Sequence, residues 1–167
     1  MLIIQAPDEV YSIQNHLNVS LFLAGGITNC PNWQRDMISK LAKADDFDHL
    51  TIFNPRRDNF DIKDPNAAEQ QIVWEYRRLR EADLIAFWFA KGSLNPIVLY
   101  ELGMWCNSRP DDPCFIGIDP EYERKQDVVL QTKLARPGLP ISQDFNSFVE
   151  IVTMALRDFF FSDSDEN

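Results

Sequence analysis

The sequence has few of the residues that build disulfide frameworks and metal sites. Its three cysteines, Cys30, Cys106 and Cys114, are odd in number and show no paired metal spacing. We therefore expect all three to be reduced and structural. The two histidines, His16 and His49, are isolated in the sequence and receive no metal or catalytic role. We expect neither a metal nor a cofactor.

Long apolar runs and an excess of basic residues are also absent. No run approaches the ~20 apolar residues that cross a bilayer, and no basic segment precedes the first apolar residues. We therefore expect a cytoplasmic protein. Sixteen Lys and Arg against 26 Asp and Glu give a formal net charge of −10. That charge disfavours nucleic acid polymers and membrane surfaces as partners, so a small-molecule ligand is expected.

The 167 residues do contain a regular alternation of apolar runs and helical patterns, which is typical of one α/β domain. We expect a single domain over residues 1–162 and an acidic flexible tail over residues 163–167. Apolar runs predict strands at residues 19–24, 50–53, 84–90 and 114–118, with an edge strand at 2–6. Helical spacing predicts helices at residues 31–43, 66–80, 96–107, 121–134 and 144–160.

Several predicted helices carry expectations about their ends or buried faces. Asn66 is expected to cap its helix, with Glu69 as the reciprocal capping partner. The apolar stripes expected to be buried are Trp33, Met37 and Leu41; Ile72, Tyr76 and Leu79; Val98, Leu102 and Trp105; and Phe148, Val152, Leu156 and Phe159.

Glu101 is a carboxylate inside an otherwise apolar helical segment. At ~100° per residue it falls about 60° from the stripe of Val98 and Leu102, at the edge of the buried face. The strand and loop before this helix place it beside the crevice at the carboxyl ends of the strands, where α/β proteins bind ligands. Two interpretations are open: a solvated helical glutamate, which is the common case, or a carboxylate that faces a ligand.

Glu75 has the same position relative to the stripe of the preceding helix. Helices on either side of one strand can be neighbours in an α/β layer, so Glu75 and Glu101 can approach one crevice. Paired acids serve displacement at an acetal-like carbon, where one attacks and the other helps the leaving group to depart. The alternative is that Glu75 pairs with Arg78 or Arg77 on its own helix.

Two loops follow predicted strands at the same edge of the sheet. Gly25 and Gly26 let backbone N–H groups approach a ligand, or they turn the chain, and the three-glycine dinucleotide spacing is absent. In the second loop, Arg56 can bind a phosphate or carboxylate, or it can pair with Asp58 or Asp61.

These segments together resemble the nucleoside 2-deoxyribosyltransferase family, in particular its deoxyribosyltransferase-like branch. The resemblance covers about half of the chain, from Leu21 to Trp105. The matching segments are Leu21-Phe22-Leu23-Ala24-Gly25-Gly26, Asn32-Trp33, Asn54-Pro55-Arg56-Arg57, Trp74-Glu75, Ala82-Asp83-Leu84 and Asn95-Pro96 through Glu101-Leu102-Gly103.

The resemblance implies a flavodoxin-like, doubly wound, mainly parallel sheet with helices on both faces. It implies transfer of a 2-deoxyribosyl group between nucleobases through a covalent sugar–enzyme intermediate. Glu101 matches the family nucleophile, and Glu75 matches the acid that contacts the departing base, which is familiar as Asp. A homo-oligomer is implied by the same analogy. The substrate contacts that the resemblance implies are Phe22, Gly25, Gly26, Asn54, Arg56, Asp83 and Asn95.

Two residues depart from the better-known family pattern. Asn95 stands where an aspartate contacts the sugar, and Phe22 stands where a tyrosine helps to position the nucleophile. The reaction is therefore open between base exchange and hydrolysis, and the substrate between a deoxynucleoside and its monophosphate. An alternative is a nucleotide-binding or sensing module with the same fold and little turnover. A purely structural or interaction protein is a third possibility.

Overall fold

A computed structural model describes residues 1–9, 19–44, 47–60, 63–108, 111 and 113–162; of residues 161 and 162 only the backbone is described. The tail predicted at residues 163–167 therefore lies outside the described residues. Within them, six parallel strands form one sheet in the order β1-β3-β2-β4-β5-β6. The strands are β1 (Leu2–Gln5), β2 (Val19–Gly25), β3 (Leu50–Asn54), β4 (Leu84–Phe89), β5 (Cys114–Ile118) and β6 (Ile141–Ser142).

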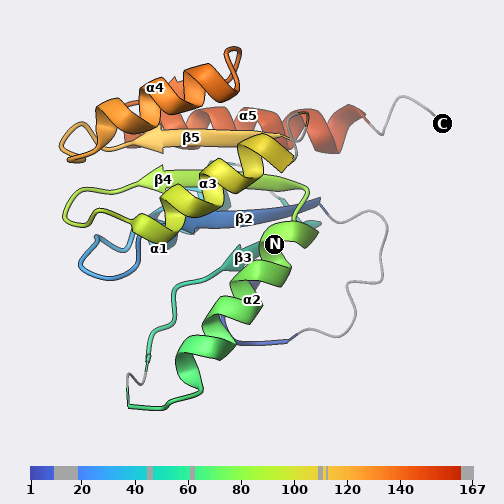
Figure 1. The fold of residues 1–167 in the computed structure, drawn as a ribbon. Coiled ribbons are helices and arrows are strands. Elements are labelled where there is room, and N and C mark those ends of the chain that lie inside the picture. Colours follow the sequence, from blue (N-terminus) through green and yellow to red (C-terminus); the bar gives the residue numbers. More distant parts are fainter. Residues whose placement is uncertain (10–18, 45–46, 61–62, 109–110, 112, 163–167) are drawn as a thin grey trace.

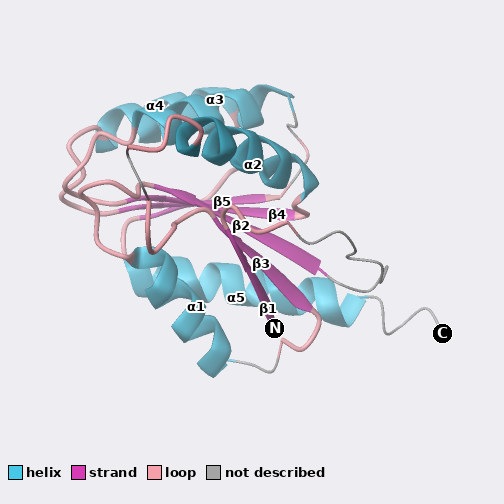
Figure 2. Cartoon of the chain, turned by 90° about the horizontal axis from the view of Figure 1, so that it is seen from below, coloured by secondary structure: helices cyan, strands magenta, loops and turns pink. Residues whose placement is uncertain are grey.

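Five helices cover the two faces of this sheet (Figure 1). Figure 2 shows α2, α3 and α4 above one face and α1 and α5 below the other. The helices are α1 (Trp33–Ala44), α2 (Ala67–Glu81), α3 (Pro96–Ser108), α4 (Lys125–Ala135) and α5 (Phe145–Ser162). Each face therefore has its own core, and the strands between them are apolar on both sides. This arrangement confirms the predicted doubly wound α/β fold.

The strand order fixes where a ligand can bind. From β2 onward the order β3-β2-β4-β5-β6 is the flavodoxin-like order, and β1 adds a parallel edge strand beside β3. The connection after β2 leads to β3 on one side, whereas the connection after β3 leads to β4 on the other side of β2. The order of the strands therefore reverses between β2 and β4. Crevices in such sheets form beyond the carboxyl ends of the strands at this switch point.

The buried face of α2 differs from the predicted stripe. Ile72 and Tyr76 are 64% and 55% exposed, whereas Trp74 and Arg78 are buried with Leu79. Arg78 is buried because its guanidinium is paired: it lies 2.9 Å from Glu9 and 2.6 Å from Glu81, and it stacks over Phe53. The prediction placed Ile72 and Tyr76 on the buried face and did not include Arg78 in it. Here the Arg78 charge has partners, whereas Ile72 and Tyr76 stay largely exposed and the Tyr76 ring carries the Arg80 guanidinium 3.6 Å from its centre.

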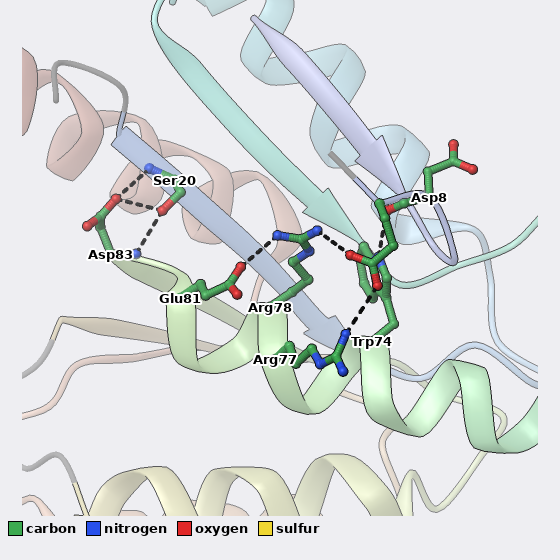
Figure 3. A network of polar contacts seen from close by, with 8 residues as sticks. Asp8, Ser20, Trp74, Arg77, Arg78, Glu81 and Asp83 are labelled. Carbon is green, nitrogen blue, oxygen red and sulfur yellow. Dashed lines mark hydrogen bonds and ion pairs between the residues drawn. The ribbon is translucent and has the colours of Figure 1, made fainter. Parts of the chain in front are cut away.

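Figure 3 shows how this face of α2 is held to the start of the chain. Trp74 Nε1 donates to the carbonyl of Asp8 over 2.9 Å, and Arg77 lies 3.5 Å from the carboxylate of Glu9. These contacts tie the middle of α2 to the segment that follows the edge strand β1. The position of Glu75, which lies between Trp74 and Tyr76, is thereby fixed relative to the sheet.

The predicted capping box at α2 is wrong. The Asn66 backbone has φ −91° and ψ −16°, and its side chain makes no capping hydrogen bond. A side-chain cap needs an extended residue at this position. Instead, the Asn66 N–H donates to Asp64 Oδ1 over 2.9 Å, and the Ala67 N–H donates to the Asp64 carbonyl. A turn that begins at Asp64 leads into the helix.

Three smaller differences concern the end of the chain. Helix α4 begins at Lys125 instead of residue 121, because Tyr122 closes a turn on Asp119 and its hydroxyl donates to the carbonyl of Leu94. The two-residue strand β6 was not predicted, since two residues carry no readable alternation. Phe159 is 39% exposed, so it departs from the predicted stripe of α5; the other three members, Phe148, Val152 and Leu156, are buried.

Candidate active site

A cavity of about 330 Å³ lies at the carboxyl ends of β2 and β4, at the point where the strand order reverses. Three parts of the chain that the resemblance singled out meet there. The lining residues include Phe22, Gly25 and Gly26 from β2 and its loop, Glu75 from α2, Asn95 from the loop after β4, and Glu101 from α3. The prediction that Glu75 and Glu101 approach one crevice is confirmed.

Glu101 lies in the second turn of α3, and its carboxylate is largely withdrawn from water. Burial and, to a smaller extent, the negative charge of Glu75 together raise the pKa of Glu101 to about 8. No hydrogen bond to this carboxylate is formed by any residue that the structure describes. The nearby Phe22 brings a ring without a hydroxyl group to the cavity. A glutamate in these surroundings holds its proton near neutral pH.

Glu75 is also half-buried at the cavity, but it has a hydrogen-bond donor. Burial raises the pKa of Glu75, whereas the hydrogen bond from Gln71 and the positive charge of Arg57 lower it. Gln71 Nε2 donates to Glu75 Oε1 over 2.7 Å. The alternative in which Glu75 pairs with Arg78 or Arg77 is wrong, because both of these arginines pair with Glu9. The donor to Glu75 thus stabilises its charged form, and the shared proton of the pair is favoured on Glu101.

The two glycines of the loop after β2 are required by close packing. A Cβ atom on Gly25 would collide with the Trp33 indole and the carbonyl of Trp88, and one on Gly26 would collide with the Asn95 amide and Cys30 Sγ. The Trp33 indole N–H donates to the Gly26 carbonyl over 3.2 Å. Trp33, the first residue of α1, therefore packs against this loop and holds it by a hydrogen bond. The absence of a Cβ atom at the two glycines makes this close contact possible.

Asn95 lines the cavity, and both polar atoms of its side chain form hydrogen bonds within the protein. It is 4% exposed, and its backbone has a φ of 49°, a left-handed conformation that asparagine tolerates better than most residues. Asn95 Nδ2 donates to the Ala90 carbonyl over 3.2 Å, and Cys30 Sγ donates to Asn95 Oδ1 over 3.4 Å. Asn95 thus joins the loop after β4 to the loop after β2 at the mouth of the cavity.

In the structure the Arg56 guanidinium bonds to its own chain. Its Nε donates to Gln34 Oε1 over 2.9 Å, and its Nη2 reaches the carbonyls of Gly26, Cys30 and Pro31 at 3.0 to 3.4 Å. The guanidinium is therefore used to hold the loop after β2, and it is not paired with Asp58; Asp61 lies outside the described residues. Neither Arg56 nor Asn54 is among the residues that line the cavity. Asn54 Oδ1 accepts a hydrogen bond from the Arg56 N–H over 3.1 Å. Both residues shape the loops around the cavity.

The prediction that Asp83 contacts substrate does not fit its position. Asp83 precedes β4, at the amino end of the sheet, and it does not line the cavity. Its Oδ2 accepts from the Ser20 hydroxyl over 2.6 Å and from the Ser20 N–H over 2.8 Å (Figure 3). The sequence could not separate the two ends of a strand by residue type alone. These hydrogen bonds link the start of β4 to the start of β2.

Two residues at the site were missed by the sequence analysis. Gln71 stands four residues before Glu75, and this spacing was a readable signal, because side chains at i and i+4 meet on a helix. Arg57 follows the arginine that was singled out, and its charge acts on Glu75. Its Nε and Nη2 are buried without a hydrogen-bond partner. Nothing in the local sequence distinguishes it from Arg56.

Other kinds of site were sought over the same part of the chain. Among the described residues, no group of three or more His, Cys, Asp or Glu side chains is placed to hold a metal ion. None of the helices there combines the length and the apolar character needed to cross a membrane. The three cysteines, all within the described residues, form no disulfide with one another.

Comparison with known proteins connects this cavity to a family. A model of the family described as Nucleoside 2-deoxyribosyltransferase like matches residues 18–122, which is more than half of the chain. The match includes β2, β4, α2 and α3, so it contains both carboxylates and all of the loops described above. A search of curated proteins gave no match. The length of the family match shows that this chain belongs to the nucleoside 2-deoxyribosyltransferase-like family.

Proposed function

We propose that this protein breaks the N-glycosidic bond of a 2-deoxynucleoside, or of its monophosphate, through a covalent sugar intermediate on Glu101. Membership of the family supports glycosyl transfer as the general chemistry. The observation that carries the proposal is that Glu101 and Glu75 line one cavity and that each is withdrawn from water. Displacement at an anomeric carbon uses two carboxylates, one as the nucleophile and one to assist the leaving group.

The protonation of the pair fits the needs of the first step. The pair holds one proton near neutral pH, favoured on Glu101, and the departing base requires one proton. As an oxygen of Glu101 bonds to the anomeric carbon, the electron pair of the carbon–nitrogen bond leaves with the base. The proton from Glu101 passes to the base through Glu75, directly or by way of a water molecule. Glu101 becomes an ester, and the base leaves neutral.

The second step decides the net reaction. If a second base attacks the sugar ester, its nitrogen takes the sugar and its proton returns to the carboxylate pair, which gives transfer. If water attacks, the product is the free sugar, which gives hydrolysis. Both outcomes restore the pair and retain the anomeric configuration, because two displacements occur at the same carbon.

The decisive experiment incubates the purified protein with a panel of deoxynucleosides and deoxynucleoside monophosphates, with and without a second free base, and separates the products by chromatography. We expect base release or base exchange, and its loss by several orders of magnitude in Glu101→Ala. Glu69→Gln is the matched control, because Glu69 is an exposed glutamate of α2 away from the cavity. Full activity in Glu101→Ala, or no product with any substrate, would contradict the proposal.

A homo-oligomer is part of the proposal. A second cavity of about 400 Å³ between α2 and α3 borders Glu75 and Glu101, and its other walls are largely apolar. Three of these wall residues, Ile72, Ile97 and Tyr100, are 63% to 70% exposed. Exposed apolar residues that gather around a groove are typical of a protein interface. A second copy of the chain is the proposed occupant, by analogy with the family, and it would cover the side of the active site.

One observation favours a second candidate function, a nucleotide-binding module with little turnover. Phe22 supplies no hydroxyl to Glu101, and no donor from the described residues supports the ionised nucleophile. Such a module binds nucleotide without consuming it. A rise in melting temperature with added nucleotide, without release of free base, would support this function over the enzyme. Detection of free base would exclude it.

A further inference from the structure

Two thiols lie beside each other away from the glycosyl site. Cys106 is in the last turns of α3 and Cys114 is the first residue of β5; both side chains are buried in the core beneath α3. The two side chains share a hydrogen bond. Neither residue lines the cavity that holds Glu75 and Glu101.

The surroundings of this pair favour a thiolate on Cys106. The hydrogen bond from Cys114 lowers the pKa of Cys106 to about 7, and the positive charge of Arg136 acts in the same direction against the effect of burial. Arg136 Nη1 also donates to Cys114 Sγ over 3.3 Å. Cys30 has the opposite character, because burial raises its pKa above the ordinary value. The more buried thiol is therefore the more nucleophilic one.

A pocket of about 400 Å³ between α3 and α4, which lie side by side in Figure 2, reaches Cys106. Leu99, Leu102 and Val128 form apolar parts of its wall. Thr132 also lines the pocket; it is 3% exposed, and its hydroxyl oxygen has no hydrogen-bond partner. A buried hydroxyl without a partner is costly unless something polar binds to it. Asp127, which pairs with Arg124, and Gln131 are the other polar residues of the wall. The pocket thus offers the unpartnered Thr132 hydroxyl and the Cys106 thiol to a small entering molecule.

We propose that Cys106 and Cys114 form a redox-active dithiol site, which a small hydroperoxide entering the α3–α4 pocket converts to a disulfide. Hydrogen peroxide fits the pocket in size, and the Thr132 hydroxyl can hold one of its oxygens while the other faces Cys106. This site is independent of the proposed glycosyl reaction. It connects the helix that carries Glu101 to the start of β5.

The oxidation takes place in two balanced steps. The Cys106 thiolate attacks one oxygen of the peroxide, the oxygen–oxygen bond breaks, and the leaving hydroxide takes a proton to become water. This step oxidises Cys106 to a sulfenic acid and reduces the peroxide. The Cys114 sulfur then attacks the Cys106 sulfur and displaces its hydroxyl group, which leaves as a second water molecule with the Cys114 proton. Two electrons have passed from the two thiols to the peroxide.

The test treats the full chain with hydrogen peroxide, blocks the remaining thiols, and maps peptides under non-reducing conditions by mass spectrometry. We expect a Cys106–Cys114 disulfide while Cys30 stays reduced, although Cys30 is the more accessible of the three thiols. In Cys114→Ser the second step is blocked, so dimedone should label Cys106 as a sulfenic acid. Oxidation of Cys30 before Cys106, or no disulfide between Cys106 and Cys114, would overturn the proposal.

Two further variants separate the roles of the pocket and of the charge. Thr132→Val keeps the side-chain shape but removes the hydroxyl, so it should slow oxidation by peroxide while the pH dependence of Cys106 alkylation by iodoacetamide stays unchanged. Arg136→Gln should slow both reactions at neutral pH by about fivefold, because less thiolate is present. Melting curves identify any variant that fails to fold, and Cys30 alkylation is the internal reference. Equal peroxide rates in wild type and Thr132→Val would overturn the role of the pocket.

Discussion

Gln71 and Glu75 lie one turn apart on α2 and share a hydrogen bond of 2.7 Å, in which Gln71 Nε2 donates to Glu75 Oε1. The same nitrogen donates to the carbonyl of Pro55 over 2.7 Å, just after β3 ends. Both amide protons of Gln71 are therefore used. The orientation of the Glu75 carboxylate, and the preference of Glu75 for its charged form, depend on the chain that leaves β3.

Replacement of Gln71 by Met should move the acid limb of the activity profile to higher pH. The variant keeps the length of the side chain but loses the donor, so burial raises the pKa of Glu75 with only Arg57 to oppose it. The pair then becomes fully protonated at a higher pH, and we expect a shift on the order of one pH unit in kcat/KM. Gln70→Met on the exposed side of α2 is the control. An unchanged profile would show that Gln71 does not set the charge of Glu75.

The raised pKa of Glu101 predicts a dependence of stability on pH. The folded pKa is about 8 and the ordinary value is 4.5, so the folded chain binds more protons than the unfolded chain between these values. The free energy of unfolding should therefore fall as pH rises from about 4.5 to about 8. Glu101→Gln cannot ionise, so it should escape this loss and be more stable than wild type by on the order of 5 kcal/mol at about pH 9.

Urea unfolding at about pH 4 and about pH 9 measures this difference directly. At the lower pH the Glu101→Gln and wild-type curves should nearly coincide, because Glu101 is mostly protonated in both the folded and the unfolded chain. Glu69→Gln should follow the wild type throughout. A constant gap between wild type and Glu101→Gln at every pH would mean that Glu101 does not hold an extra proton in the folded protein.

The fold was predictable because its strands are buried on both faces. The runs at residues 84–90 and 114–118 are apolar without alternation, and β4 and β5 occupy almost the same residues. The errors lie where burial depends on a distant partner. Arg78 can be buried because its guanidinium pairs, at 2.9 Å, with Glu9, which lies 69 residues earlier in the chain. The periodicity of α2 alone does not reveal such a contact. The buried face was therefore predicted from Ile72 and Tyr76, which are exposed in the structure.

The site was predictable to the extent that its residues follow strands in a sheet of known direction. Glu75 and Glu101 were found from their place beside buried stripes and from the family pattern, and they meet at one cavity. Asp83 and Arg56 fit the same family pattern but serve as structural ties. A family motif includes residues that build the loops around a site as well as residues that contact a ligand. Only the hydrogen bonds of the folded chain separate the two groups.

Replacement of Gly26 by Ala should disturb the mouth of the cavity. The added methyl group would meet the Asn95 side chain and Cys30 Sγ, and these atoms are part of the contact between the two loops. We expect a loss of about 1 to 3 kcal/mol in the free energy of unfolding, together with weaker substrate binding. Gly138→Ala is the control, since its new Cβ would have no neighbour within 4 Å. Equal urea midpoints for the two variants would refute the packing argument.

The exposed apolar groove between α2 and α3 predicts the effect of charge on assembly. Ile72 and Tyr100 line this groove and are 64% and 70% exposed, so Asp at both positions should place charge inside the proposed interface. We expect the double variant to sediment as a monomer while wild type sediments as an oligomer, because desolvating an unpaired carboxylate opposes association. Leu134→Asp with Met154→Asp is the matched control, since these residues are 79% and 62% exposed on α4 and α5. A monomeric wild type, or a control that dissociates equally, would contradict this interface.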